Sequence, residues 1–462
     1  MIARIFAAQN SNKYNLRTTN SKERILKLEK LKKEIKSQED SIYKALSKDL
    51  RKSYFEAALT EIYFVYGEID HAIKNLSAWM RPKSAARFLP NILAKNKLYY
   101  EPKGSTLIIA PWNYPFQLVM GPLVSAIAAG NTVIVKPSEF SKYTSEVMQQ
   151  IINNVFNENE VACVLGDVEV STELLGLPFD HIFFTGSTQV GKIVMEAAAK
   201  NLTSCTLELG GKSPVVITEN ADIETAAHKI AWGKLMNAGQ TCIAPDYVLI
   251  HESQKDSFIG AYKKFTKEMF YNGDNINTAV YGKIINEKNF DRLVDLLNEA
   301  VDGGARVDYG GKFQKSDLTF QPTIVTQLND HHKLSKEEIF GPILPIYTYK
   351  TLEEAVTKIN NQPKPLAAYF FSQKTKEINY LIKYTSAGGT CVNDVLLHIS
   401  NPNVPFGGIG PSGMGSSHGV YGFKAFSHER TVMFQSNIHL TKMIYPPYLG
   451  KEWLLKLLKK LY

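Results

Sequence analysis

The chain has 462 residues, enough for roughly two to four domains with a sizeable buried interior. Apolar residues make up 44% of the sequence and charged residues 21%, which are ordinary globular values and exclude an intrinsically disordered chain. The net charge of +8 is spread among many carboxylates, without the Arg-rich stripe that tracks a phosphate backbone. We therefore expect no nucleic acid partner.

The four cysteines argue against a disulfide framework and against a zinc site, because they lack CxxC pairing. We expect no metal, and a reducing cytoplasmic location. Cys163, Cys205 and Cys391 are interpreted as buried small hydrophobic residues. Residues 1–12 lack the long apolar core and the cleavage site of a signal peptide.

Residues 20–80 are expected to be helical. Asn20 and Glu23 have the spacing of a capping box, and apolar residues then recur at near-helical intervals. The apolar stretch 118–135 is interrupted by Gly and Pro residues. This predicts a buried helix followed by a buried strand, since a membrane span needs about 20 uninterrupted apolar residues.

Short apolar runs alternate with helical stretches from residue 107 onward. Runs that are apolar on both faces are typical of a parallel sheet covered by helices. These runs are 107–110, 132–135, 162–165 and 181–184. A second alternating region follows residue 211, with strands at 215–217 and 247–250 around a helix near 223–237. The pattern predicts a doubly wound nucleotide-binding domain and a second α/β domain, with a ligand site between them.

A single thiol stands among small, turn-forming residues at 237–245. A thiolate nucleophile needs an approachable backbone and a neighbour that handles protons. Glu208, close to Gly210 and Gly211, supplies a carboxylate beside flexible backbone. We interpret Cys242 as the nucleophile and Glu208 as its general base, which requires the fold to bring the two together.

Residues that follow two of the predicted strands could bind a dinucleotide. Residues 184–192, with Gly186, Ser187 and Gly191, follow an apolar strand and open a helix whose free N–H groups could hold a pyrophosphate. The glycine pattern is shorter than GxGxxG, so a plain strand-to-helix turn fits equally well. Lys136 and Glu139 end another strand, where they suit ribose hydroxyls and favour NAD over NADP; a solvated charged turn is the alternative.

Two further loops carry candidate residues. Two prolines and two large aromatics fix the path of 111–115, so the amide of Asn113 could stabilise an oxyanion or simply cap the loop. Glu338 and Phe340 stand two residues apart before a turn, which an ordinary helix end would also produce.

Together and in this order, these motifs resemble the aldehyde dehydrogenase superfamily over residues 21–434, and most of all its class 3 branch, which includes fatty aldehyde dehydrogenases. The branch marks are residues 240–247, the short N-terminal region, and 405–415 followed by 418–419. The resemblance implies that Cys242 attacks an aldehyde, with Asn113 and the Cys242 N–H as the oxyanion hole. Hydride then passes to NAD, or to NADP, and Glu208 activates the water that hydrolyses the thioester.

The resemblance also implies a cofactor site and a domain plan. The implied cofactor contacts are Lys136 and Glu139 at the adenosine ribose, Gly186, Ser187 and Gly191 at the pyrophosphate turn, and Glu338 and Phe340 at the nicotinamide ribose. The implied domains are a Rossmann-like NAD-binding domain at 1–82 and 103–208, an α/β catalytic domain at 209–423, and a small β bridging element at 83–102 and 424–440. Two subunits are expected to pair through the bridging element into a homodimer.

The tail 441–462 ends in a predicted amphipathic helix from residue 451 onward. Its apolar face is Trp453, Leu454, Leu457, Leu458 and Leu461, and its basic face is Lys456, Lys459 and Lys460. Such a helix could lie peripherally on an anionic membrane surface, cover the substrate entrance, or pack on its own dimer.

A few residues bear on the alternative activities and on the class of substrate. A CoA-acylating dehydrogenase would dispense with the base Glu208, and a binding protein on the same fold would not need Cys242, Glu208 and Asn113 together. Nearby apolar residues suggest a hydrophobic pocket, although core packing explains them equally well. They are Tyr114, Met120, Trp232 and Ile243. We expect medium to long aliphatic or aromatic aldehydes, with succinate semialdehyde as the alternative.

Overall fold

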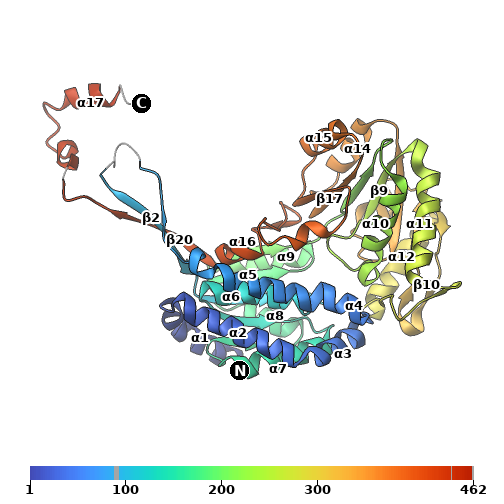
Figure 1. The fold of residues 1–462 in the computed structure, drawn as a ribbon, viewed down its shortest axis with the longest axis horizontal. Helices are drawn as coiled ribbons and strands as arrows, with labels where there is room; N and C mark the ends of the chain where they lie inside the picture. Colours follow the sequence, from blue (N-terminus) through green and yellow to red (C-terminus); the bar gives the residue numbers. More distant parts are fainter. Residues whose placement is uncertain (88–92, 439, 460–462) are drawn as a thin grey trace.

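The computed structural model describes residues 1–87, 93–438 and 440–459. Figure 1 shows two α/β bodies side by side, and a β-stranded arm that projects from the first body and carries the C-terminal tail. The expected fold class, two α/β units with a small β element, is confirmed. Residues 88–92 of the expected bridging element lie outside the described residues.

The N-terminal region is helical, as expected. Its elements are α1 (Ile2–Arg17), α2 (Ser21–Ser37), α3 (Glu39–Leu50), α4 (Tyr54–Ala57), the π-helix η1 (Ala58–Ile62) and α5 (Tyr63–Trp79). The capping box is present: the Asn20 side chain accepts from the Glu23 backbone N–H, and the Glu23 carboxylate accepts from the Asn20 N–H. Helix α1 was not predicted; its apolar residues Ile2, Ile5 and Phe6 join a core beneath the first sheet.

The first sheet has the strand order β19-β7-β6-β3-β4-β5. Its parallel strands are β3 (Ser105–Ile109), β4 (Thr132–Lys136), β5 (Val161–Cys163), β6 (His181–Thr185) and β7 (Ser204–Glu208), and its helices are α6 (Gln117–Ala129), α7 (Lys142–Val155), α8 (Val168–Leu175) and α9 (Thr188–Ala199). The four predicted apolar runs are β3 to β6, and the stretch 118–135 forms most of α6 and β4. The chain order reverses between β3 and β6, which places a ligand crevice at their carboxyl ends.

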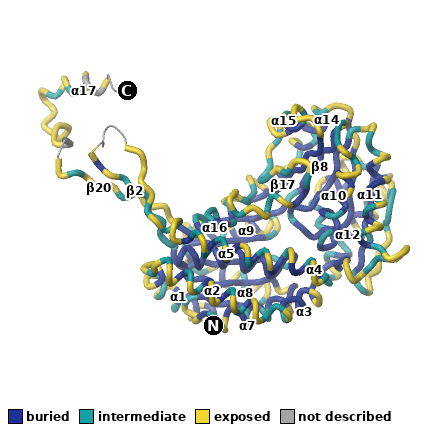
Figure 2. Tube along the Cα trace, in the orientation of Figure 1, coloured by how far each residue is buried: buried dark blue, intermediate teal, exposed yellow. Residues whose placement is uncertain are grey.

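The central strands are apolar on both faces because helices cover both. Successive strand side chains point to opposite faces, so Ile108 and Val133 enter one core with α2, α5 and α6. Leu107 and Ile134 enter the other core with α1, α8 and α9. Figure 2 shows buried residues gathered in the interior of each body and exposed residues along its outer surface. Of the cysteines interpreted as buried, Cys163 is buried, but Cys205 and Cys391 are only half-buried, a correction to that interpretation.

The second sheet has the order β12-β15-β16-β9-β8-β17-β18, in which β12 alone is antiparallel to its neighbour. Its strands are β8 (Pro214–Ile217), β9 (Tyr247–His251), β12 (Arg306–Tyr309), β15 (Thr323–Thr326), β16 (Ile343–Tyr349), β17 (Ala367–Phe371) and β18 (Gly389–Val392). Its helices are α10 (Ile223–Leu235), α11 (Lys255–Phe270), α12 (Glu287–Asp302), α13 (Lys333–Lys336), α14 (Leu352–Asn360) and α15 (Thr375–Tyr384). Two separate two-stranded ribbons lie in the same part of the chain. They are β10 (Tyr271–Asn272) with β11 (Asn275–Ile276), and β13 (Phe313–Gln314) with β14 (Thr319–Phe320). The predicted strands 215–217 and 247–250 and the helix between them are confirmed.

The chain then returns to the first body. Strand β19 (Gly413–Met414) pairs with β7, where Gly413 lies opposite Glu208, and α16 (Gly419–Ala425) packs on α5 and α6. The range 209–423 expected for the catalytic domain therefore contains a segment that belongs to the first sheet. This return carries residues 417–418 to the carboxyl end of β7.

The arm is an antiparallel sheet of β1 (Lys83–Ser84), β2 (Lys95–Pro102) and β20 (Ser427–Phe434), in the order β1-β2-β20. The tail follows it, and part of the predicted tail helix is present as α17 (Glu452–Leu458), well away from both bodies (Figure 1). Lys460 and Leu461 lie outside the described residues. Within the described part of the chain, no helix is both long and apolar enough to cross a bilayer.

Candidate active site

Cys242 lies on a tightly held loop between η3 (Met236–Gly239) and β9. Asn237 and Ala238 both have a φ of 52°, a left-handed conformation that non-glycine residues adopt at an energetic cost. Gly239 has a φ of 78°, and a Cβ there would lie 2.3 Å from the carbonyl oxygen of Gly341. The small residues noted in the sequence thus allow the thiol loop to approach the 338–342 segment closely.

Cys242 borders two main cavities. The first cavity, about 250 Å³, is lined by Pro111, Trp112, Asn113, Leu118, Thr185, Gly186, Ser187, Glu208, Leu209, Gly210, Cys242, Asn289, Arg292, Glu338 and Phe340. The second cavity, about 170 Å³, is mostly apolar and is lined by Leu59, Thr60, Phe64, Tyr114, Gln117, Leu118, Trp232, Met236, Thr241, Cys242, Ile243, Leu396, Leu397, Ile399 and Ser400. The thiol is therefore accessible from both cavities.

Glu208 ends β7 and reaches the first cavity, so the structure brings the predicted base and nucleophile together. Burial raises the pKa of Glu208 to about 8, although the hydroxyl of Ser417 opposes the shift. That hydroxyl donates to Oε1 at 2.9 Å, while Oε2 has no hydrogen-bond partner among the described residues. A carboxylate with a pKa near neutrality and a free oxygen is suited to general base catalysis.

The thiol itself is far from ionised in this arrangement. Burial raises the pKa of Cys242 to about 12, and the negative charges of Glu338 and Glu208 add to the effect. A protonated thiol is a weak nucleophile, so its attack requires a base that removes the proton.

Asn113 belongs to the loop after β3 and is buried against the thiol loop. Its Nδ2 donates to the carbonyl oxygen of Gln240 at 3.1 Å. The backbone carbonyl oxygen of Asn113 accepts from Lys52 Nζ at 3.0 Å and from Asn237 Nδ2 at 2.8 Å. A carboxamide nitrogen carries two N–H donors, so the loop contact to Gln240 leaves one for a ligand in the first cavity.

The turn after β6 has the predicted strand–turn–helix context. Gly186 and Ser187 line the first cavity. Ser187 is also the N-cap of α9, and its hydroxyl accepts from the Val190 N–H. Gly191 does not line that cavity. A Cβ at Gly191 would lie 2.7 Å from the Leu209 side chain, so this glycine permits close packing of α9 on the sheet.

Glu338 and Phe340 follow α13 and line the first cavity opposite that turn. Burial raises the pKa of Glu338 to about 8, and Asp246 adds to the shift. A Cβ at Gly210 would lie 2.2 Å from the Glu338 carboxylate, so only glycine leaves room there. The Phe340 ring packs edge-on against Trp112, with centroids 5.4 Å apart.

Lys136 and Glu139 are not brought to this cavity. They lie at the carboxyl end of β4, where Lys136 Nζ contacts Glu139 Oε2 at 3.0 Å. This position at the sheet edge is compatible with both interpretations given from the sequence, a ribose-binding pair and a solvated charged turn.

The second cavity contains three of the four apolar residues singled out in the sequence, Tyr114, Trp232 and Ile243. Met120 is instead fully buried in the core of the first body, so core packing, the alternative given for these residues, applies to it. Sequence reasoning missed the walls supplied by η1, α5 and the segment 396–400, and it missed Ser417. Their only signal in the sequence is ordinary apolar or small polar character.

Residues 2–432 match the model of the aldehyde dehydrogenase family. The 4,4′-diaponeurosporen-aldehyde dehydrogenase of Staphylococcus aureus is 45% identical over 92% of this chain and 92% of its own. Mouse aldehyde dehydrogenase family 3 member A2 is 43% identical over 92% of this chain and 87% of its own. A solved structure of Staphylococcus aureus AldH in a substrate-bound state matches with a TM-score of 0.95, 43% identity and 99% coverage of both chains.

The matches confirm the resemblance drawn from the motifs, including its class 3 character. They extend through the thiol loop, the β7 end and the returning segment that carries Ser417. This chain therefore belongs to the aldehyde dehydrogenase family, and its reaction is the NAD(P)-dependent oxidation of an aldehyde.

Proposed function

We propose that Cys242 is the nucleophile, Asn113 the oxyanion-stabilising amide and Glu208 the general base of this reaction. The observation that carries the proposal is the position of these three residues on one cavity wall, with Cys242 also bordering the apolar second cavity. In the first step Cys242 Sγ bonds to the aldehyde carbon while its proton leaves to solvent water in the cavity, so Glu208 is needed only for the later hydrolysis. Asn113 Nδ2 and the Cys242 backbone N–H stabilise the negative oxygen.

The first cavity fits NAD(P) because it presents acceptors that the protein leaves unsatisfied. Glu338 Oε1 has no partner among the described residues, and Gly210 keeps space beside that carboxylate. NAD(P), when bound there, would supply the hydride acceptor that the oxidation needs. The proposed holding residues are Gly186 and Ser187 at the pyrophosphate, Glu338 and Phe340 at the nicotinamide ribose, and Lys136 and Glu139 at the adenosine ribose. Gly191 would act indirectly, by letting α9 pack closely behind the pyrophosphate turn.

Glu208 completes the cycle by hydrolysis. It removes a proton from water, the hydroxide oxygen bonds to the thioester carbon, and the carbon–sulfur bond breaks to release the acid. A pKa of about 8 leaves part of the Glu208 population ionised at neutral pH, and Oε2 is free to accept the proton. The same base argues against CoA acylation, in which CoA rather than water would take the acyl group.

We propose medium to long aliphatic or aromatic aldehydes as substrates. None of the described residues lining the second cavity is charged, so a chain of CH₂ groups or a ring would be favoured there. Succinate semialdehyde carries a carboxylate that needs a cationic partner, and no lysine or arginine is among the described residues that line this cavity.

A kinetic series tests this substrate class. With saturating NAD, kcat/KM should rise from propanal to decanal and should be high for benzaldehyde, because each buried CH₂ contributes about 0.8 kcal/mol. Succinate semialdehyde serves as the charged comparison. A preference for succinate semialdehyde over hexanal would overturn the apolar assignment.

The cofactor preference, the quaternary structure and the tail are further parts of the proposal. Glu139 would repel a 2′-phosphate, which favours NAD over NADP. The arm and tail extend beyond both bodies (Figure 1), a shape that suits pairing of two subunits into a homodimer. Exposed Trp453, on the predicted apolar face of α17, suits packing on the dimer or peripheral contact with a membrane surface in the cytoplasm.

A further inference from the structure

A buried ion pair lies behind the loop that follows β3 and carries Asn113, residues 111–116, which we call the oxyanion loop. The side chains of Lys52 and Glu61 are both 0% exposed, and Lys52 Nζ bonds directly to Glu61 Oε1. Glu61 comes from the π-helix η1, a distortion of helical geometry that is frequent at functional sites. Buried charges are costly unless every partner is supplied, so the contacts of this pair indicate what it holds.

Glu61 fixes the far end of the loop. Its Oε2 accepts from the backbone N–H groups of Phe116 and Gln117, at 3.1 and 2.9 Å, where α6 begins. A carboxylate at a helix N-terminus is favourable because it meets free N–H groups and the positive end of the helix dipole.

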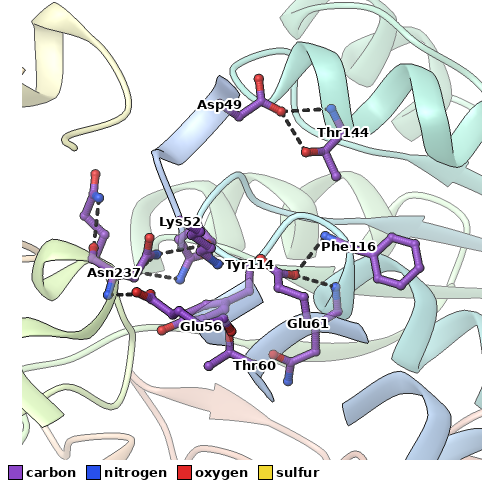
Figure 3. A network of polar contacts seen from close by, with 12 residues as sticks. Asp49, Lys52, Glu56, Thr60, Glu61, Tyr114, Phe116, Thr144 and Asn237 are labelled. Atoms are coloured by element: carbon purple, nitrogen blue, oxygen red, sulfur yellow. Dashed lines mark hydrogen bonds and ion pairs between the residues drawn. The ribbon is translucent and has the colours of Figure 1, made fainter. Parts of the chain in front are cut away.

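Lys52 fixes the middle of the loop. Its Nζ donates to the carbonyl oxygen of Asn113 at 3.0 Å and lies 3.8 Å from the centre of the Tyr114 ring. The Tyr114 hydroxyl in turn contacts Thr241 Oγ1 at 2.7 Å, next to the nucleophile. One buried cation therefore contacts two consecutive residues of the oxyanion loop (Figure 3).

A second contact from the same region reaches the thiol loop. The Glu56 carboxylate on α4 accepts from the backbone N–H of Asn237 at 2.8 Å. Asn237 Nδ2 donates to the carbonyl oxygens of Asn113 and Gln240, at 2.8 and 3.1 Å. Lys52 and Asn237, both labelled in Figure 3, come from different elements and donate to the same backbone carbonyl oxygen of Asn113.

We propose that Lys52, held by Glu61, is a positioning residue that aims the side-chain amide of Asn113 at the developing oxyanion. Two donors on one carbonyl oxygen restrain the Asn113 peptide, and an oxyanion donor is effective only when its position is set before the reaction. The inference rests on the proposed catalytic role of Asn113. It assigns the ion pair a function in catalysis beyond holding the helices together.

A double-mutant cycle tests the inference. Lys52→Met and Asn113→Ala are made singly and together, and the single-turnover rate of NADH formation is measured with saturating aldehyde and NAD. Asn113→Ala should slow this step about 100-fold, the usual loss for one oxyanion donor. Lys52→Met should slow the enzyme at least about tenfold when Asn113 is present, and less than about threefold when it is already alanine.

Glu61→Gln provides a second cycle that preserves side-chain shape. It removes the charge opposite Lys52 and retains an oxygen for the helix N–H groups, so it should also be non-additive with Asn113→Ala. If Lys52→Met does not yield folded protein, this cycle decides the question. Equal fold-losses in both Asn113 backgrounds would overturn the inference.

Arg24→Met is the matched control for loss of a buried cation. Arg24 is 4% exposed and donates to the Ala128 carbonyl oxygen and to Thr19 Oγ1, away from both active-site loops. It should lower Tm while the rate per folded enzyme changes less than about twofold. An Asn113→Ala enzyme with full rate would refute the role of Asn113 and this inference with it, whereas additive cycles would refute the inference alone.

Discussion

The hydroxyl of Ser417 donates to Glu208 Oε1 at 2.9 Å, although 209 residues of chain separate the two. The returning β19 segment makes this contact, because Gly413 pairs with Glu208 itself. Ser417 therefore stabilises the ionised form of the proposed base, while burial favours the neutral form.

Ser417→Ala should shift the pH dependence of turnover to higher pH. Loss of the donor raises the pKa of Glu208 further above about 8, and a base acts only when ionised. The rising limb of kcat against pH should therefore move to the alkaline side in steady-state assays between pH 6 and 10. Ser427→Ala, which removes a buried hydroxyl bonded to the Phe423 carbonyl, is the control. An unmoved limb would show that Ser417 does not tune the base.

Cys242→Ala should abolish aldehyde oxidation and leave cofactor binding largely intact, since it removes only the atom that bonds to the substrate. NADH production reports the first effect, and titration of protein fluorescence with NADH reports the second. Cys391→Ala, at a half-buried position on β18, controls for loss of a thiol. More than a trace of turnover in Cys242→Ala would refute the nucleophile assignment.

Glu208→Gln should separate the two halves of the reaction. The amide keeps the side-chain shape but cannot take a proton from water, so the thioester should accumulate. Rapid mixing should give a burst of about one NADH per active site followed by slow turnover. Full steady-state activity without a burst would place the base elsewhere.

Glu208 should also make stability depend on pH. Its pKa rises from 4.5 to about 8 on folding, so between these values the folded state holds a proton that the unfolded state releases. Stability from this group is complete below pH 4.5 and is lost as pH rises through 8. The Tm of Glu208→Gln, relative to the native enzyme, should therefore be higher at pH 8.5 than at pH 5.

Calorimetry at the two pH values measures this difference, with exposed Glu146→Gln as the control. A Tm difference that is the same at both pH values would mean that Glu208 gains no proton on folding.

The sequence predicted those parts of the site that depend on local pattern. The turn after β6 and the small residues around Cys242 were recognisable because a strand-to-helix turn and a close backbone approach need particular residues. A ligand site between the two α/β domains was predicted because parallel strands end together at one edge of a sheet.

Long-range contacts left no such pattern. Lys52 and Glu61 read as ordinary charges in a helical region, and nothing local distinguishes a solvated lysine from a fully buried one. Met120 was not distinguished from the cavity residues because α6 is buried on nearly every side, so apolar character could not separate cavity wall from core. Ser417 required knowledge that the chain returns to the first sheet.

The last prediction concerns the tail. Deleting residues 449–462 removes α17, on which Trp453 and Leu455 are 54% and 60% exposed and Lys456 is exposed. If the helix covers the substrate entrance in the dimer, the deletion should raise KM for decanal more than for propanal, since only the longer chain reaches beyond the second cavity. If it lies on membranes, the intact protein should bind anionic vesicles in a salt-sensitive manner and the deleted protein should not.

Trp453→Asp in the full-length protein is the matched variant, because it removes apolar contact without shortening the chain. It should reproduce the change in KM for decanal and weaken vesicle binding, as the deletion does. Sedimentation of both proteins reports whether the dimer persists. Equal kinetics for the two aldehydes, with no vesicle binding by the intact protein, would discard both roles and leave packing on the dimer as the function of the tail.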